Sequence, residues 1–438
     1  MITITNTLTG KKELFTPLNR DHVQLYVCGV TPYDYAHIGH GRCYVTFDIL
    51  YRLLKSAYKK VTYCRNFTDV DDKLMARAQQ ELGDRLRYHE VAQKFMQAYT
   101  QDMNNLNCLT PDVQPCATQT INEIIALVSK LIKEGYAYEV DGDVYFRVRA
   151  FKDYGKLSKR KLDDLQAGAR VEVNDKKEDP LDFALWKAEA ENTFWKSPWG
   201  YGRPGWHIEC SAMAATHLSP HIDIHAGGMD LIFPHHENEI AQSEAVYGPD
   251  FARYWMHNAF VRIDQEKMSK SLGNFFTLRD VFGQFDPMVI RFYILQHHYR
   301  SPLDFSFNDI KGAQKAYNKI CKALVEVTAQ PPTANDEKSL YEAIMDFLYD
   351  DLNTPGALGV VFENLSDTKN LAVLKYVLQA MLGLTLIPLV EKETEITPEI
   401  QALLDAREHA RAQKDWAQAD SLRDQLLELG VTIIDKKI

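Results

Sequence analysis

One stretch near the N-terminus combines residue types that bind anions. It reads Cys28-Gly-Val-Thr-Pro-Tyr-Asp-Tyr-Ala-His37-Ile-Gly-His40-Gly-Arg42, with two imidazoles and two glycines where a helix is expected to begin. Backbone N–H groups and the positive end of the helix dipole favour a phosphate at such a position. Glycine also lets a flat ring lie against the backbone. The stretch therefore indicates a nucleotide or phosphate site, although the histidines alone could be no more than a helix cap.

A second, distant stretch carries positive charge on a polar loop. Residues 264–274 include Lys267 and Lys270 and end in Gly-Asn, which is typical of a mobile loop. Lysines on such a loop can close over the charge that develops when pyrophosphate leaves. The alternative is that both lysines are ordinary solvated surface residues.

Four further side chains suit a metal ion. Cys28, Cys210, His235 and Glu239 offer sulfur, nitrogen and oxygen ligands that together suit zinc. Only His235 and Glu239 are neighbours by helical spacing, four residues apart after Pro234. On the residues alone we favour the simpler interpretation, in which both cysteines are small buried apolar groups. Three other histidines compete as ligands, namely His207, His225 and His236.

The elements around the first stretch indicate how it is positioned. The apolar run 24–28 predicts a buried strand, and Val45, Ile49 and Leu53 recur at helical spacing as far as Lys55. The run 61–66 predicts a second strand. A strand, a helix and a strand form a βαβ unit, and open α/β sheets bind ligands at the turn after the strand. We therefore expect an α/β fold of the Rossmann type.

Bulk composition agrees with an ordinary multidomain globular protein. The chain has 438 residues, 45% hydrophobic and 25% charged residues, and a net charge of −10. The acidic balance argues against a general nucleic-acid binder, although the basic segment 152–161 allows a specific one. Seven scattered cysteines without a CxxC pair indicate reduced thiols and a cytoplasmic protein. The sequence contains no apparent signal peptide and no apolar run long enough to cross a membrane.

Taken together, the motifs resemble a known family. His37-Ile-Gly-His40 and Lys267-Met-Ser-Lys-Ser271 are similar to the two signatures of class I aminoacyl-tRNA synthetases. The strings beginning at Tyr26, Asn66, Arg203 and Phe233 resemble cysteinyl-tRNA synthetases in particular. The resemblance is nearly continuous from about residue 20 to 310 and looser beyond, where residues 350–355 and 414–420 resemble the family's helical and anticodon-binding parts.

The resemblance implies a site and a reaction. A single zinc ion would be held by Cys28, Cys210, His235 and Glu239, and would bind the thiol of L-cysteine. ATP, with Mg²⁺, would give cysteinyl adenylate and pyrophosphate, and tRNA(Cys) would then receive the cysteinyl group. The catalytic residues would be His37, His40, Lys267 and Lys270. ATP would also contact Gly39, Gly227, Gly228 and Asp230. The amino-acid pocket would include Gly29, Thr31, Thr68, Trp206 and His225. Asp230 would bind either the ribose or the substrate ammonium, and Trp206 could instead be a core residue.

The resemblance also implies a domain order. We expect the first half of the Rossmann catalytic domain in 1–115, a connective insertion in 116–200 and the second half in 201–255. A stem-contact region with the lysine loop would occupy 256–310, a helical bundle 311–395 and an anticodon-binding region 396–438. A monomer is expected. The family's Gly-Thr-x-Trp-Arg close is missing, since the sequence ends at Asp435-Lys-Lys-Ile438, and the helical region after Leu365 looks shorter than the family pattern. Both departures bear on anticodon recognition.

Two other functions fit part of the pattern. A ligase that joins cysteine to an amino sugar would share the front end, but would not need the long helical C-terminal region. A non-catalytic tRNA-binding protein would not need the histidine, lysine and zinc-ligand motifs. An assay for transfer of cysteine to tRNA or to a glucosaminyl inositol distinguishes a tRNA-charging ligase from the amino-sugar ligase.

Overall fold

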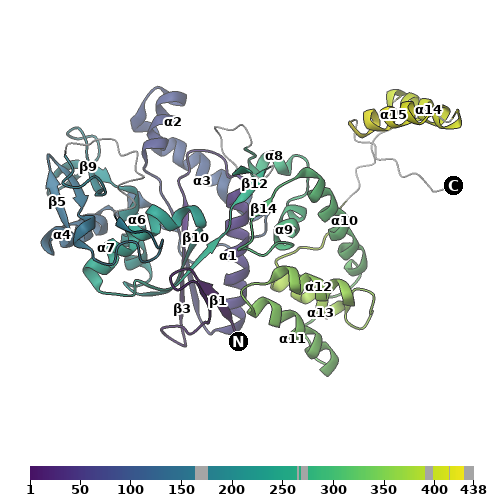
Figure 1. Cartoon of the computed structure of the whole chain (residues 1–438), viewed down its shortest axis with the longest axis horizontal. Coiled ribbons are helices and arrows are strands. Elements are labelled where there is room, and N and C mark those ends of the chain that lie inside the picture. The colour runs from purple at the N-terminus through teal and green to yellow at the C-terminus, as the bar shows by residue number, and fades with distance from the viewer. Residues whose placement is uncertain (163–175, 264–265, 268–274, 390–397, 414, 429–438) are drawn as a thin grey trace. The chain divides into compact units, whose positions relative to one another are not determined.

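The computed structural model describes residues 1–162, 176–263, 266–267, 275–389, 398–413 and 415–428. The chain divides into two compact units, Met1–Ile387 and Pro388–Ile438 (Figure 1). The first unit contains every predicted site residue that the structure describes.

A four-stranded parallel sheet forms the centre of the first unit. Its strands are β3 (Val23–Val30), β4 (Val61–Phe67), β10 (Ile222–Gly228) and β11 (Ala252–Asn258), in the order β11-β10-β3-β4. Helix α1 (Ile38–Ala57) connects β3 to β4, as the sequence predicts. Helix α7 (Glu237–Tyr247) connects β10 to β11 on the other side. The chain therefore passes from β3 toward one edge of the sheet and from β10 toward the opposite edge. Ligands bind at such a switch point between two neighbouring strands.

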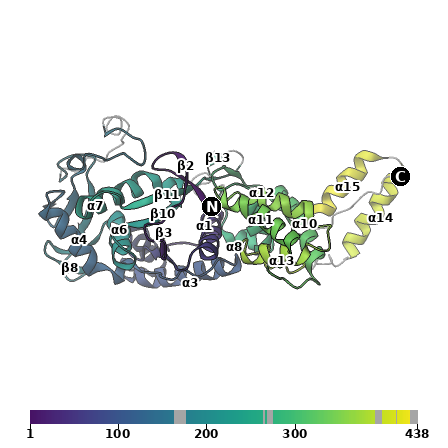
Figure 2. The ribbon, with the colours of Figure 1, turned by 90° about the horizontal axis from the view of Figure 1, so that it is seen from below.

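Helix α1 is buried along most of its length, which is unusual for a helix on an open sheet. It packs against the sheet on one side and against α9 (Pro287–Leu295) on the other. The buried Asp48 carboxylate on α1 accepts hydrogen bonds from Arg291 of α9 and from Arg52. Figures 1 and 2 both show α1 between the parallel sheet and the helices α10 to α13. Both faces of this helix are therefore fixed by packing.

The predicted insertion contains a separate antiparallel sheet. Its strands are β5 (Ala137–Val140), β6 (Asp143–Phe146), β7 (Phe183–Ala188), β8 (Trp195–Ser197) and β9 (Gly200–Pro204), in the order β5-β6-β7-β9-β8. The short helices η2 (Ala117–Gln119) and η3 (Val148–Ala150) and the helix α4 (Ile121–Lys133) accompany it. Helix α6 (Trp206–His217) returns the chain from this sheet to the parallel sheet.

Short elements frame the edge of the sheet. The sequence of residues 2–15 predicts a short β-rich lead, and a hairpin of β1 (Thr3–Asn6) and β2 (Lys11–Leu14) confirms it. Helices α2 (Asp72–Leu82), η1 (Arg85–Arg87) and α3 (Tyr88–Asn105) follow β4. The one-turn helices η4 (Met229–Leu231) and η5 (Ile232–His236) lie between β10 and α7. The α-helix therefore begins at Glu237, three residues after Pro234.

The remainder of the first unit is mostly helical. It comprises β12 (Val261–Ile263), β13 (Glu266–Lys267), α8 (Leu278–Phe282), α9, β14 (Leu303–Asp304) and α10 (Phe307–Leu324). Helices α11 (Asn335–Tyr349), α12 (Thr354–Asn364) and α13 (Leu371–Ala380) complete it. The stretch 330–336, with two prolines, predicts a bend or linker, and it overlaps the connection between α10 and α11.

The second unit is a helix pair, α14 (Pro398–Ala412) and α15 (Trp416–Glu428). The sequence predicts a helix pair at roughly 397–411 and 415–429, and these bounds confirm it. The sequence also predicts a cap at Gly430 and a strand at 431–434, which lie outside the described residues. Within the described part of the chain, no helix has the length and apolar character to span a bilayer.

Candidate metal and nucleotide site

Three elements converge at the switch point between β3 and β10. Cys28 lies near the carboxyl end of β3, and Cys210 lies in the second turn of α6. His235 precedes α7 and Glu239 lies in its first turn. All four side chains are buried. The fold thus gathers residues that are up to 211 positions apart in the sequence.

The donor atoms of these four residues are close together. The Cys28 and Cys210 sulfurs are 3.9 Å apart, and Cys28 Sγ is 3.4 Å from Glu239 Oε1. His235 Nε2 is 3.1 Å from the same oxygen. All four donor atoms lie within 4.8 Å of one another.

These separations fit tetrahedral zinc. With bonds of about 2.3 Å to sulfur and about 2.0–2.1 Å to nitrogen and oxygen, tetrahedral sulfurs lie about 3.8 Å apart. On the same geometry a sulfur and an oxygen lie about 3.6 Å apart, and a nitrogen and an oxygen about 3.3 Å apart. The observed distances match these values within a few tenths of an ångström. Two thiols, an imidazole and a carboxylate are also a donor set that zinc accepts.

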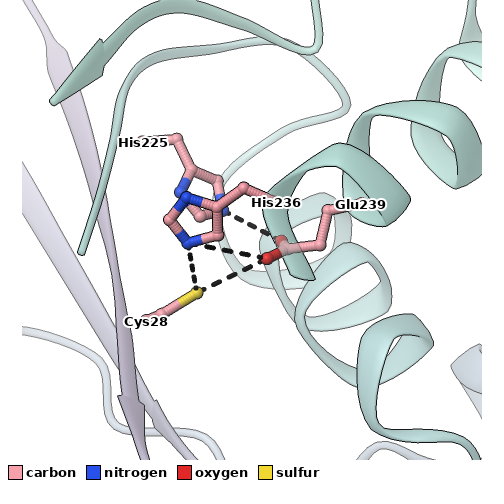
Figure 3. Close-up of side chains that lie close together, drawn as sticks. All are labelled: Cys28, His225, His236 and Glu239. Carbon is pink, nitrogen blue, oxygen red and sulfur yellow. Dashed lines mark hydrogen bonds and ion pairs between the residues drawn. The ribbon is translucent and has the colours of Figure 1, made fainter. Parts of the chain in front are cut away.

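A second set of donors overlaps the first. Cys28 and Glu239 also lie beside His225 and His236, as Figure 3 shows. His236 Nε2 is 3.3 Å from Cys28 Sγ, and His225 Nε2 is 2.9 Å from Glu239 Oε2. The two sets share Cys28 and Glu239, so two ions bound there would have to share both ligands. The first set has two sulfurs and the second has one, and this difference favours the first for zinc.

The histidines outside the first set hold its members in place. The His225 ring bridges to the second oxygen of Glu239 and stacks on Trp255, with ring centroids 4.4 Å apart. The His207 and His235 Nδ1 atoms are 2.9 Å apart. Metal-binding groups are commonly oriented by such outer partners.

A chain of hydrogen-bonded side chains extends from His236 to the N-terminal hairpin. His236 Nδ1 is 2.8 Å from His257 Nε2, and His257 Nδ1 is 2.7 Å from the Thr7 hydroxyl. Burial lowers the pKa of both His236 and His257, the latter to about 3, so both rings are neutral. The chain ties the β10–α7 connection to β11 and to the N-terminal hairpin.

Burial is outweighed by neighbouring side chains in setting the pKa values of Glu239, His235 and Cys210. Burial alone would raise the pKa of Glu239, but His225 and His235 lower it to about 2. Burial alone would lower the pKa of His235, but Glu239 and Cys210 raise it to about 10. A hydrogen bond from Cys28, aided by His235, lowers the pKa of Cys210 to about 6 against burial. Carboxylate, imidazolium and thiolate therefore form a buried set of opposite charges that a cation can join.

The two histidines of the first stretch occupy the start of α1. His37 is the N-cap, and each backbone N–H of His37 and His40 donates to Nδ1 of the other ring at 3.2 Å. The rings are stacked with their centroids 3.6 Å apart. Because both Nδ1 atoms accept, the ring protons lie on Nε2. The pair can therefore present two N–H donors to an anion at the helix terminus.

The segment after the lysine loop is joined to these histidines. His37 forms a β-bridge with Thr277, and Ile38 N donates to Phe276 O at 3.3 Å. Leu278 N donates to Ala36 O at 2.7 Å. Before the loop, β13 pairs with β12. Segment 276–278, which follows the second predicted stretch in the sequence, is thus adjacent in space to the first stretch.

The loop lysines themselves are only partly described. Lys267 ends β13, which is known by its backbone alone, and Lys270 lies outside the described residues. Their proposed contacts with phosphate are therefore not tested by the structure.

Several residues predicted for the amino-acid pocket lie beside members of the cluster. Gly29 follows Cys28, and Thr68 follows β4 and is buried. A Cβ at residue 29 would lie 1.5 Å from Asn66 O, so only glycine fits there. Trp206 is 40% exposed and stacks on His235, with centroids 4.3 Å apart. The alternative in which Trp206 is a core residue is therefore wrong.

The predicted nucleotide residues follow the two strands on either side of the switch point. Gly39 lies in the first turn of α1, and Gly227 and Gly228 end β10. Asp230 lies in η4 and is exposed. A Cβ at Gly227 would approach Leu231 and His236 closely. The structure does not distinguish the ribose and ammonium roles of Asp230.

Some site residues were not predicted. His257 and Glu209 are buried beside the cluster, and the half-buried Thr7 contacts His257. Neither His257 nor Thr7 has a local sequence pattern that marks it, because their partners are more than 20 residues away. Glu209 directly precedes Cys210, and no sequence pattern marks it. Only the burial of its side chain in the folded structure distinguishes it from other glutamates.

Comparison with known proteins identifies related sequences over the whole chain. The family model for the class I (C) tRNA synthetase catalytic domain matches residues 14–315, and that for the cysteinyl-tRNA ligase anticodon-binding domain matches residues 393–437. The cysteine–tRNA ligase of Pelobacter propionicus is 46% identical, covering 99% of this chain and 97% of the relative. That of Nitratidesulfovibrio vulgaris (strain DP4) is 47% identical, covering 99% and 98%.

Solved structures support the fold. A methionyl-tRNA synthetase of Mycobacterium tuberculosis has a TM-score of 0.55 at 15% identity, covering 91% of this chain and 96% of that one. A leucyl-tRNA synthetase of Agrobacterium radiobacter has a TM-score of 0.59 at 10% identity, covering 84% of each chain.

Proposed function

The chain belongs to the cysteine–tRNA ligase family of class I aminoacyl-tRNA synthetases, and from that membership we propose how its residues carry out the reaction. The substrates are L-cysteine, ATP and tRNA(Cys). The observation that carries the proposal is the cluster of Cys28, Cys210, His235 and Glu239, whose donor atoms lie within 4.8 Å of one another.

The four residues of this cluster hold zinc. A bound zinc ion supplies a Lewis acid that stabilises the substrate sulfur as a thiolate, which serine's hydroxyl cannot match. A pocket that discriminates by shape alone separates near-isosteres by about 1–3 kcal/mol, whereas a required bonding group allows a factor of about 10⁴–10⁵. Discrimination against serine therefore needs no separate editing domain.

The first chemical step is adenylate formation. The cysteine carboxylate attacks the α-phosphorus of ATP, a P–O bond forms, and the bond to pyrophosphate breaks. His37 and His40 donate from Nε2 to the triphosphate, and Gly39 lets it approach the helix terminus. Gly227, Gly228 and Asp230 bind the adenosine. Lys267 and Lys270, with Mg²⁺, offset the charge that develops on the leaving pyrophosphate.

The second step transfers the cysteinyl group to a ribose hydroxyl of tRNA, releasing AMP. No covalent enzyme intermediate is required, so the rate depends on positioning and electrostatic stabilisation. The anticodon-binding model that matches residues 393–437 favours tRNA over an amino sugar as the acceptor. The enzyme acts as a monomer in the cytoplasm, where its seven free cysteines stay reduced.

One experiment tests the metal role. Cys210→Ser is compared with Cys321→Ser, a buried cysteine of α10 that lies outside the cluster. We expect Cys210→Ser to lose zinc and cysteine-dependent ATP–pyrophosphate exchange together, while Cys321→Ser keeps both. Full zinc occupancy in Cys210→Ser would show that the ligand set is wrong.

A second assay tests the acceptor. Purified wild-type protein is given radiolabelled cysteine and ATP with either tRNA(Cys) or a glucosaminyl inositol. We expect cysteine to be transferred to the tRNA alone. Transfer to the amino sugar, or no activation of cysteine at all, contradicts the proposed function.

A further inference from the structure

Asn258, the last residue of β11, carries a buried hydrogen-bond acceptor that is left unpaired. The residue is 5% exposed. Its Nδ2 donates to Ala259 O at 3.2 Å, and this bond fixes which way the amide points. Its Oδ1 has no hydrogen-bond partner among the described residues. A buried acceptor without a partner costs free energy, so a ligand that brings a donor to it gains affinity.

The strand determines on which face of the sheet Asn258 lies. Successive side chains of a strand point to opposite faces. The rings of Trp255 and His257 both contact His236, with centroids 5.3 Å and 5.0 Å away, so these side chains lie on the face that carries α7. Asn258 therefore lies on the opposite face, where α1 packs against β10 and β11. Figure 1 shows α7 and α1 on the two sides of the sheet.

The start of α1 lies close to the end of β11. Arg42 Nη1 donates to Phe260 O at 2.9 Å, two residues after Asn258. His37 and His40, at the start of the same helix, are the residues that the proposed function assigns to the triphosphate. Asn258 thus shares one face of the sheet with the proposed phosphate site.

The neighbouring strand ends in the residues that the proposed function assigns to adenosine. Gly228, the last residue of β10, is in register with Asn258, so a Cβ there would point to the same face. Such a Cβ would clash with Asp230 Oδ1, which places the Asp230 carboxylate on this face as well. Asp230 is exposed, whereas Asn258 is buried. The face therefore offers an exposed charged acceptor and a buried neutral one.

The two halves of adenosine suit these two acceptors differently. The ribose is polar and carries hydroxyl donors, which fit an exposed carboxylate. Adenine is flat and largely apolar, and its 6-amino group is the donor on its edge. A buried neutral acceptor therefore fits the base. Guanine presents an oxygen at the same position, and turning the amide of Asn258 to suit it would break the bond to Ala259.

We propose that Asn258 Oδ1 accepts a hydrogen bond from the 6-amino group of the adenine of ATP, and that Asn258 thereby sets the nucleotide specificity of the enzyme. The inference rests on the proposed function, because ATP must bind across the ends of β10 and α1. Its test is chosen so that the two claims fail separately.

The test compares two nucleotides that differ only in the 6-amino group. Purine riboside 5′-triphosphate keeps the ring, the ribose and the phosphates of ATP but has hydrogen at position 6. Cysteine-dependent pyrophosphate exchange gives kcat/KM for each nucleotide with wild type, Asn258→Leu and Asn258→Asp. Leucine has a similar size and no acceptor, whereas aspartate keeps an oxygen in place of Oδ1. Zinc content and thermal melts are recorded for every variant.

The inference predicts an effect that depends on the nucleotide. Wild type should use ATP about 10-fold better than purine riboside triphosphate, the range for one buried hydrogen bond. Asn258→Leu should lower kcat/KM for ATP by a similar factor and change that for the analogue by less than about twofold, so that the preference disappears. Asn258→Asp should keep part of the preference.

Asn6→Leu is a matched control. Asn6 of β1 is also a buried asparagine and contacts the same strand, but its polar atoms are paired. Its Nδ2 donates to Arg253 O at 3.1 Å, and its Oδ1 accepts from Trp255 N at 3.0 Å. We expect this variant to lose stability and to keep the wild-type preference for ATP over the analogue.

Other outcomes overturn the inference. An equal loss with both nucleotides in Asn258→Leu indicates a structural role. Loss of discrimination against 2′-deoxyATP or 3′-deoxyATP, with discrimination against purine riboside triphosphate intact, means that the acceptor faces the ribose. A wild-type preference near one refutes the inference even where neither variant folds. If wild type shows no cysteine-dependent exchange, the proposed function itself fails.

Discussion

His37 and His40 cap each other: each backbone N–H donates to Nδ1 of the other ring at 3.2 Å. One pair of side chains thus closes the first turn of α1 and fixes the ring tautomers, with the proton of each ring on Nε2. Stability and catalysis should therefore be separable at this position.

The first prediction separates them at His37. His37→Ala removes the N-cap of α1 and should cost about 0.5–2 kcal/mol of unfolding free energy, whereas asparagine can restore the cap. Both His37→Ala and His37→Asn should slow adenylate formation by about 10²–10³-fold, because neither presents the Nε2–H donor. Urea unfolding and pyrophosphate exchange provide the two readouts. Equal stability of the alanine variant and wild type would contradict the capping role.

The second prediction concerns the lysine loop. Lys270→Ala should slow adenylate formation by orders of magnitude, with little change in fold, because the variant lacks a charge needed only as pyrophosphate leaves. Lys319→Ala, which alters an exposed lysine of α10, should exchange pyrophosphate at the wild-type rate. Single-turnover kinetics with circular dichroism measure both effects. Near-normal activation by Lys270→Ala would refute the role.

The third prediction concerns Arg42, which joins α1 to the residue before β12 and to the segment before β14. Its buried guanidinium donates to Phe260 O at 2.9 Å, to the carbonyl oxygens of His298 and Tyr299 at 3.2 Å each, and to Ser301 O. Lysine lacks the planar fork that reaches several acceptors at once. Arg42→Lys should therefore lose about 1–3 kcal/mol of stability, because buried carbonyl groups are left unpaired.

Arg253→Lys is the control for that substitution, since Arg253 is exposed beside Tyr254. It should melt within about 1 °C of wild type, as surface changes usually do. Thermal melts of the two variants side by side test the claim. If both shift equally, the carbonyl contacts of Arg42 contribute little.

The fourth prediction is a pH dependence at Asp102 of α3. Burial raises the pKa of its carboxyl to about 6, against the opposing effect of Arg279 of α8, whose Nε is 3.2 Å from Oδ1. The folded state therefore binds a proton more tightly than the unfolded state, so this group stabilises the fold below about pH 4. That contribution declines as pH rises through about 6.

Asp102→Asn removes this titration while keeping an oxygen for Arg279. Its melting temperature relative to wild type should rise between about pH 4 and pH 7. Asp280→Asn would alter the cap of α8 instead, since Asp280 Oδ2 accepts from Thr277 N at 2.8 Å, and should give no such rise. A pH-independent difference between Asp102→Asn and wild type would refute the prediction.

The sequence predicts the elements that are defined by local periodicity. The strand–helix–strand unit of β3, α1 and β4 was predicted within a few residues, because apolar spacing and a turn rich in glycine specify it locally. Helix α7 begins three residues later than Pro234 suggests. The domain boundaries stay predictions.

The site is harder to predict, because its contacts are long-range. The structure brings Cys28, Cys210, His235 and Glu239 together, but their spacing alone favoured buried apolar cysteines. Their convergence was expected only from the family resemblance, and their role as ligands stays a proposal. Trp206 was ambiguous because exposure depends on the surrounding fold. The mutual cap of His37 and His40 requires ring orientations that no pattern specifies.

The metal cluster also bears on the synthesis of the chain. Cys28 leaves the ribosome more than 200 residues before Glu239, so an incomplete chain can offer only part of the coordination sphere. On the proposed ligand set, zinc capture becomes available only after the insertion sheet has been made, and a nascent chain that stalls within that sheet holds reduced thiols with an incomplete set of ligands. Resistance of Cys28 to alkylation would thus report, during translation, that both halves of the sheet have joined.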